Sequence, residues 1–172
     1  MRKLRLIGGA GLVLAFVLCG CGTDYRWRSS VPSNARTVCV PTFRNESEVM
    51  ELGAIASRQI LREFQREGTF KVAAEDDAAV EIQGTVKSAS GMTNAYDRRT
   101  RLRMAAFDMT AVVEVSVIDK RTHKVLMDNR KYVARTSFTA GQDQTTAQRD
   151  ASGRLMDDLA RQVVDDILNL KW

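Results

Sequence analysis

Every second side chain between Phe107 and Val117 is apolar, and this alternation limits the possible folds more than any other feature of the sequence. The apolar positions are Phe107, Met109, Ala111, Val113, Val115 and Val117. Successive side chains of a β-strand point to opposite faces of its sheet, so the pattern predicts a strand with one buried and one exposed face. Such a strand needs a second layer of structure to cover its apolar side.

Three further segments have the composition of strands. Residues 37–43 are rich in β-branched side chains, but Pro41 cannot donate a hydrogen bond to a sheet. Pro41 therefore indicates either an edge strand or the end of the strand, and of the two we expect an edge strand. Residues 80–87 alternate with a period of two, and residues 125–138 change phase, which a β-bulge near Asp128-Asn129 would explain. The last three strands follow one another along the chain, so we expect them to pair antiparallel.

Two segments repeat apolar residues at steps of three and four, which predicts amphipathic helices over 47–67 and 146–170. Ser47 is placed to cap the start of the first helix, and Gly68 can end it in the left-handed conformation. Gly153 lies within the second helix at a cost of about 1 kcal/mol relative to alanine.

The elements therefore follow in the order strand, helix, three strands, helix, and each has one apolar face. Two helices packed on one face of a four-stranded mixed sheet would bury all of these faces, which makes the predicted fold class α+β, a two-layer sandwich. We expect residues 35–172 to form this single domain. The other face of the sheet would meet water or a polar partner, and it carries Glu81, Thr85, Asp108, Thr110, Glu114 and Ser116.

The first twenty residues have the layout of a secretory signal peptide, with basic residues before an apolar run over 6–18. That run is shorter than the roughly 20 residues a membrane-spanning helix needs. Residues 18–22 resemble the lipobox read by lipoprotein signal peptidase, which predicts cleavage after residue 20 and acylation of Cys21 by diacylglycerol and palmitate-like chains. Several acyl chains together make a lasting membrane anchor. Residues 21–34 are then a lipidated tether.

Charge and cysteine content exclude several classes of function. Removing the three cations of the signal peptide lowers the formal net charge from +5 to +2, which gives no support for nucleic-acid binding. With Cys21 acylated, Cys39 has no partner in the mature chain for a disulfide. Its apolar neighbours indicate a small buried side chain.

The sequence lacks the signatures of enzymes. The single histidine, His123, stands in a polar link and is interpreted as an exposed turn residue. The paired aspartates occur on polar helix faces and in a connection, as expected for solvated residues. Metal-ligand, nucleophile-elbow and phosphate-loop motifs do not occur. We therefore expect a protein that is not an enzyme and has no cofactor besides the covalent lipid on Cys21.

One charge cluster has functional potential, at the end of the polar, turn-rich segment 88–100. It consists of Arg98, Arg99, Arg101 and Arg103. Arginine offers planar, paired donors that suit phosphate and carboxylate groups, so the cluster could hold a phosphorylated lipid head or an acidic protein. The alternative is a solvated loop that keeps the sheet edge soluble.

Several stretches in order along the chain resemble the LPS-assembly lipoprotein family, LptE. They are Cys21-Gly22, Tyr25-Arg26, residues 31–45, 60–68 and 79–84, Tyr96-Asp97, the long alternating strand and the last helix. The resemblance implies two helices on a four-stranded sheet, in agreement with the periodicity. It also implies an outer-membrane lipoprotein on the periplasmic face that plugs the barrel LptD, helps it assemble, and assists lipopolysaccharide transport to the outer leaflet.

The resemblance also implies a role for individual residues. The four arginines occupy the region implicated in lipopolysaccharide contact, which favours the functional interpretation of the cluster. Gly22 is not the aspartate that retains lipoproteins in the inner membrane of enteric bacteria. The chain departs from the family at His123, where a turn glycine is common, and at residues 141–143, where enteric members carry a basic contact. The alternative from another class is a periplasmic lipoprotein that activates a cell-wall synthase, because residues 38–45 also resemble such activators.

Overall fold

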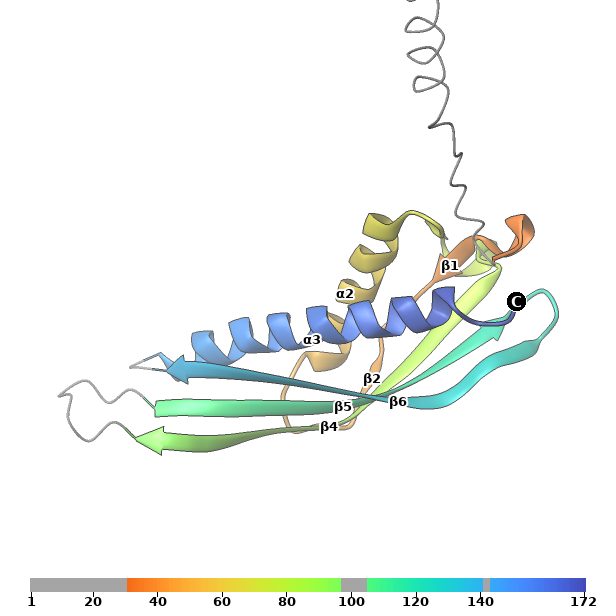
Figure 1. Ribbon diagram of the computed structural model, residues 1–172. Helices are drawn as coiled ribbons and strands as arrows, with labels where there is room; N and C mark the ends of the chain where they lie inside the picture. The colour runs from red at the N-terminus through yellow and green to blue at the C-terminus, as the bar shows by residue number, and fades with distance from the viewer. Residues whose placement is uncertain (1–30, 97–104, 141–142) are drawn as a thin grey trace, which may run out of the picture.

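The computed structural model describes residues 31–96, 105–140 and 143–172. Figure 1 shows two helices packed along one side of a long, twisted sheet. The strands are β1 (Thr37–Cys39), β2 (Arg44–Asn45), β3 (Lys71–Val72), β4 (Val80–Tyr96), β5 (Ala105–Asp119) and β6 (Lys124–Ala140). The helices are α2 (Leu52–Glu67) and α3 (Gln144–Leu168), with short 3-10 turns at Ser33–Ala35 and Glu75–Asp77.

The sheet is mixed and has six strands, in the order β3-β1-β4-β5-β6 with β2 also paired to β4. β1 runs parallel to β3 and β4, β2 runs parallel to β4, and β4, β5 and β6 pair antiparallel. The predicted class, α+β with two helices on a mixed sheet, is confirmed. The predicted count of four strands is wrong, because β2 and β3 have two residues each and show no period in the sequence.

The first predicted strand, residues 37–43, is shorter than expected: it ends at Cys39, and the chain rejoins the sheet at β2, just beyond the predicted range. β1 pairs with the start of β4, and β2 pairs further along the same strand, with Arg44 opposite Thr85. The expectation of an edge strand is wrong, since β1 lies between β3 and β4. Pro41 is accommodated because it follows the end of β1, where no ladder hydrogen bond is needed.

The buried hydroxyl of Ser57 on α2 fixes the segment that connects β1 and β2. It accepts a hydrogen bond from the backbone N–H of Phe43 at 2.7 Å, and it lies 3.1 Å from the carbonyl oxygen of Pro41 and 3.0 Å from that of Gly53. The ring of Phe43 then packs directly on Gly84 of β4. These contacts hold α2 and the segment between β1 and β2 against the sheet.

The helix boundaries differ from those predicted mainly at their starts. α2 begins at Leu52, because Ser47 donates its hydroxyl to the side-chain oxygen of Asn45 instead of capping the helix, and Glu51 turns the chain with a φ of 65°. Gly68 ends α2 as predicted, with a φ of 83° and its N–H bonded to the carbonyl of Phe64. α3 is shifted toward the N-terminus and is capped by Asp143, whose carboxylate accepts from the N–H of Thr146 at 2.9 Å.

The long strands include one confirmed bulge and one extension that the sequence did not predict. The pairing of β5 with β6 skips at Asp128 and Asn129, and Asn129 has a φ of 41°, so the predicted bulge is confirmed. The expected loop after residue 87 is instead strand as far as Tyr96. Pairing with β5 satisfies the backbone there, so small polar side chains can occupy a strand without an apolar period.

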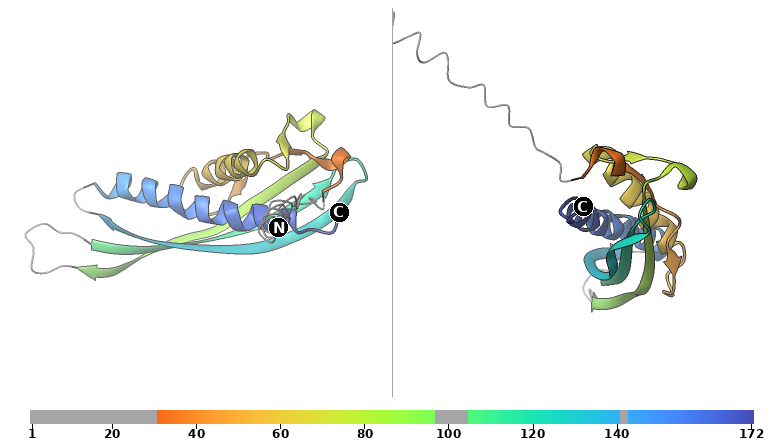
Figure 2. Two further views of the ribbon diagram at one scale, coloured as in Figure 1. Left: turned by 45° about the horizontal axis from the view of Figure 1, so that its top comes forward. Right: turned by 90° about the vertical axis from the view of Figure 1, so that its right-hand side faces the viewer.

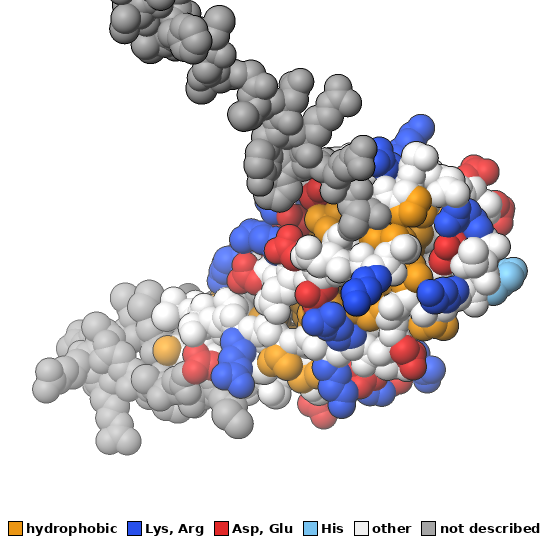
Figure 3. Space-filling view, turned by 45° about the vertical axis from the view of Figure 1, so that its right-hand side comes forward, with side chains coloured by type: hydrophobic (Ala, Val, Ile, Leu, Met, Phe, Trp, Pro, Cys, Tyr) orange, Lys and Arg blue, Asp and Glu red, His pale blue; other side chains and the backbone are white. Residues whose placement is uncertain are grey.

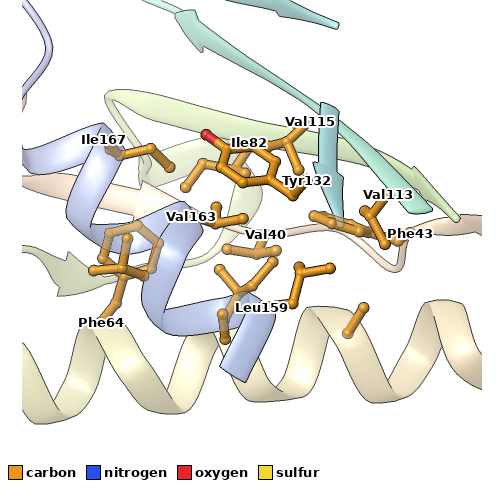
Figure 4. Packing of buried hydrophobic residues seen from close by; sticks show 14 of the residues in the cluster. Val40, Phe43, Phe64, Ile82, Val113, Val115, Tyr132, Leu159, Val163 and Ile167 are labelled. Carbon is orange, nitrogen blue, oxygen red and sulfur yellow. The ribbon is translucent and has the colours of Figure 1, made fainter. Parts of the chain in front are cut away.

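The core lies between the sheet and the two helices. All apolar residues of β5 from Met109 to Val117 in the predicted phase are buried, and they meet Leu159, Val163 and Ile167 of α3 and Phe64 of α2 in one cluster (Figure 4). The views in Figure 2 show both helices on the same side of the sheet. The other sheet face has no helix on it among the described residues.

Candidate functional site

The predicted arginine cluster belongs to the connection between β4 and β5. These strands pair as far as Tyr96 and Ala105, so the connection starts and ends at the tip of a long hairpin. Arg98, Arg99, Arg101 and Arg103 fall in residues 97–104, outside the described residues, as does Cys21. Their proposed roles therefore stay predictions.

The strands that lead to this connection form an extension of the sheet, which we call the distal ribbon. It comprises residues 88–96 of β4, 105–112 of β5 and 133–140 of β6, which pair along their length with one register shift in β4 between Thr93 and Ala95. Figure 1 shows that the ribbon extends beyond α2 and that the first half of α3 runs along it. On its helix side, the rings of Phe107 and Phe138 stack with their centroids 5.2 Å apart.

The open face of the sheet is polar, as predicted. Its six predicted residues are all partly exposed. An ion pair joins β5 to β6 on this face, with Glu114 3.6 Å from Lys131, and Glu81 of β4 lies 4.0 Å from Lys120 in the turn after β5. A shallow hollow of about 380 Å³ lies on this face, with Arg44, Gln83 and Thr85 in its lining. Many hydrogen-bond donors and acceptors lie close together here, so the face can bind polar groups of a partner.

Two aliphatic pairs interrupt the polar face, and the sequence analysis did not identify them. Val125 lies opposite Ile118 and Val133 lies opposite Val112, and the two β6 valines are 52% and 47% exposed. Ile118, Val112 and Val133 stand out of phase with the buried positions of their strands, which is a signal in the sequence. Val125 has the same parity as the buried Met127 and reaches the open face only through the register shift between Val117 and Ile118. Single exposed aliphatic residues are common on protein surfaces, so these pairs do not by themselves mark an interface.

Charged side chains of both signs are interspersed on the face of the molecule that Figure 3 shows. At the start of the distal ribbon, Lys87 bridges to Glu46 across 2.6 Å, and the hydrogen bond from Lys87 holds the pKa of this carboxyl below its usual value. Both side chains are in contact with solvent, so the pair contributes little to stability.

Two residues singled out in the sequence have the structural roles that were predicted. Cys39 is 5% exposed, and burial followed by the negative charge of Glu81 raises the pKa of its thiol, so it is a buried side chain without thiolate character. His123 is exposed in the turn between β5 and β6 with a φ of 53°. The turn thus needs the left-handed conformation that a glycine adopts most easily.

Within the described part of the chain, no group of three or more His, Cys, Asp and Glu residues is arranged to hold a metal ion. None of the helices described is both long enough and apolar enough to cross a membrane.

Solved structures share this fold at low sequence identity. A lipoprotein from Caulobacter crescentus is 12% identical, with a TM-score of 0.52 over 74% of this chain and 88% of its own. A hypothetical protein from Chlamydia trachomatis is 14% identical, with a TM-score of 0.50 over 77% of this chain and 95% of its own. A Helicobacter pylori protein described as a homologue of a neuraminyllactose-binding hemagglutinin is 9% identical, with a TM-score of 0.50 over 80% of this chain and 88% of its own.

These likenesses establish the fold alone. A comparison of the sequence with curated proteins finds no match. The family model for lipopolysaccharide assembly, LptE, matches residues 35–167 and thus most of the chain, so this protein belongs to the LptE family.

Proposed function

We propose that the protein is an outer-membrane lipoprotein, anchored on the periplasmic face through acyl chains on Cys21. It plugs and helps to assemble an LptD-type barrel, and it assists the transport of lipopolysaccharide to the outer leaflet. The single observation that carries this proposal is the family match over residues 35–167. The family is one of cofactor-free lipoproteins without enzymatic activity.

The open sheet face supports the part of this proposal that concerns the barrel. The lumen of an outer-membrane barrel is lined by polar side chains. A face with half-buried carboxylates, amides and hydroxyls offers such a wall many hydrogen bonds, and Val125 and Val133 add apolar contact points. The protein would then act through surface contact, in agreement with a family that carries out no bond-making chemistry.

The hairpin tip supports the part that concerns lipopolysaccharide. Four arginines follow one another within residues 98–103, and the paired ends of β4 and β5 hold both ends of this connection at the tip of the ribbon. Guanidinium groups bind phosphates through paired hydrogen bonds, and the lipid part of lipopolysaccharide carries phosphates. The proposal assigns Arg98, Arg99, Arg101 and Arg103 to this contact.

Changing the four arginines together to glutamine tests the assignment. We expect weaker binding of lipopolysaccharide to the purified lipoprotein, and an unchanged melting temperature, because glutamine keeps each of the four positions polar. A matched control changes four exposed cations elsewhere, Arg58, Arg62, Lys71 and Lys171, to glutamine. Unchanged affinity in the first variant, or an equal loss in the control, would leave the cluster as a solvated loop.

A further inference from the structure

β6 leaves one long edge of the sheet open. The strand stands last in the sheet order, and among the described residues it pairs only with β5. In an antiparallel sheet, the backbone N–H and C=O groups of every second residue point away from the paired neighbour. Within the part of the chain that the structure describes, residues 130–140 form backbone-to-backbone hydrogen bonds with β5 alone. Their outward groups are therefore free to pair with one more strand.

The distal part of β6 is regular enough to accept such a strand. Proteins protect open sheet edges with prolines, bulges, charges or very short strands. Residues 130–140 contain no proline or glycine, and they pair with residues 105–115 without a register shift. The bulge at Asp128-Asn129 lies before them. Charge is the protection that remains, and it has one sign.

The first half of α3 forms a groove beside this edge. A hollow of about 440 Å³ lies between Ser137–Thr139 of β6 and the helix, where Ala147, Asp150 and Arg154 line it. Figure 1 shows the end of β6 next to the start of α3. Extended peptides add to open sheet edges through backbone hydrogen bonds and place alternate side chains in adjacent pockets. The hollow is placed to receive every second side chain of an added strand.

The charges at this edge favour an acidic partner. Residues 130–140 carry three cationic side chains and no acidic one. Arg135 of this strand and Arg154 of α3 are exposed, and neither forms an ion pair with another described residue. Opposite charges on neighbouring strands attract and like charges repel. An acidic strand therefore fits this edge, whereas the β6 edge of a second copy would bring cations beside cations.

We propose that residues 130–140 of β6 bind an extended, acidic segment of a partner protein as an added strand of the sheet. One set of alternate side chains of this segment enters the hollow, where it meets Ala147 and the partly buried ring of Phe138. The other set lies on the open face beside Arg135 and carries the acidic groups. The inference goes beyond the proposed function, because it concerns neither the open face itself nor the residues assigned to lipopolysaccharide.

Selection of peptides by the purified full-length lipoprotein tests the proposal. The probe is a phage library of random twelve-residue peptides, and we expect the selected sequences to be acidic and to alternate polar with apolar residues. A synthetic peptide of the selected sequence is then N-methylated at every second residue. Methylation in one phase should abolish binding and in the other phase should leave it unchanged, since only one side of an added strand faces β6. Failure to enrich acidic sequences, or equal effects of the two phases, would overturn the proposal.

Reversing two charges locates the bound peptide. We expect Arg135→Glu combined with Arg154→Glu to weaken binding roughly tenfold, because repulsion replaces attraction at both positions. The matched control reverses two exposed arginines of α2, Arg58→Glu with Arg62→Glu, and should leave the affinity unchanged. Equal losses in the two double variants, with melting temperatures that show both are folded, would contradict the proposal.

Amide hydrogen exchange gives an independent measurement on the unmodified protein. The bound peptide should slow exchange in residues 130–140, whose outward N–H groups it pairs with, and should leave β3, at the opposite edge of the sheet, unchanged. Protection that spares residues 130–140 would contradict strand addition at this edge.

Discussion

At the scale of single residues, Phe43 fixes the segment between β1 and β2 to both layers of the fold. The backbone of Phe43 bonds to Ser57 on α2, and its ring covers Gly84 on β4. The aromatic ring replaces the packing that glycine, lacking a side chain, cannot supply in a strand. The sequence showed that residues 80–87 alternate, but it did not show why a glycine stands among the valines, because its partner comes from a segment forty residues earlier in the chain.

The Gly84 contact gives the first prediction. A methyl group at residue 84 would overlap the buried ring of Phe43, so Gly84→Ala should lower the free energy of unfolding by about 1–3 kcal/mol. Gly153→Ala is the matched control, because a methyl group there meets open space within a helix and should raise the free energy of unfolding by about 0.5–1 kcal/mol. Urea denaturation of the two variants measures both, and a stable Gly84→Ala protein would refute the contact.

Asp119 gives a prediction about pH. Burial alone would raise the pKa of this carboxyl, but hydrogen bonds from the side chain and backbone of Arg121 and from Thr122 outweigh burial and lower it below its ordinary value of 3.8. A carboxyl with a lowered pKa stabilises the fold above its unfolded pKa, and this contribution is lost as the pH falls through the folded value.

We therefore expect the free energy of unfolding to drop as the pH falls below about 4. The drop should be smaller in Asp119→Asn, because this variant has no carboxyl at residue 119 to protonate. The measurement is urea denaturation at pH 7 and at several values below 4, with the exposed Asp158→Asn as control. An identical pH dependence for wild type and Asp119→Asn would show that the turn carboxyl does not titrate as the geometry requires.

At the scale of elements, helices and strands with a regular apolar period could be predicted from the sequence. Very short strands, and strands that depend on pairing with a neighbour, could not. The alternation over 107–117, the two amphipathic helices and the bulge at Asp128-Asn129 all lie where the sequence indicated. The two-residue strands β2 and β3 carry no period, and their pairing depends on neighbours distant in sequence. The extension of β4 to Tyr96 depends on its pairing with β5 instead of on apolar side chains.

The candidate site was predictable to the same extent. The arginine cluster can be recognised from the sequence because four arginines occur within six residues. The open polar face follows from the alternation of polar and apolar residues along the strands. The stacked Phe107–Phe138 pair needs the register between β5 and β6, and the hollow beside it needs the position of α3. Neither can be obtained from one strand alone.

The start of α3 gives a prediction at this scale. Asp143 accepts a hydrogen bond from the N–H of Thr146, which would otherwise lack a partner in the first turn. Asp143→Ala should therefore cost about 1 kcal/mol of unfolding free energy, whereas Asp143→Asn keeps an accepting oxygen and should cost much less. Equal stability of the alanine and asparagine variants in thermal denaturation would mean that another group caps the helix.

At the scale of the whole molecule, the two sides of the sheet are suited to different partners. The open face presents polar groups and the valines at 125 and 133, and the helix side of the distal ribbon presents the stacked, partly buried rings of Phe107 and Phe138. A lipid anchor on Cys21 would keep both surfaces at the membrane, ten residues before the first described residue, Val31. This arrangement fits a protein that holds a barrel with one surface and a glycolipid with another.

Isolation of the full-length protein from detergent extracts at its natural abundance, followed by mass spectrometry of everything bound to it, tests this account most directly. The account predicts a large outer-membrane barrel as the main partner and diacylglycerol on Cys21. A cell-wall synthase as the main partner, or an unlipidated protein recovered from the cytosol without any barrel, would contradict it.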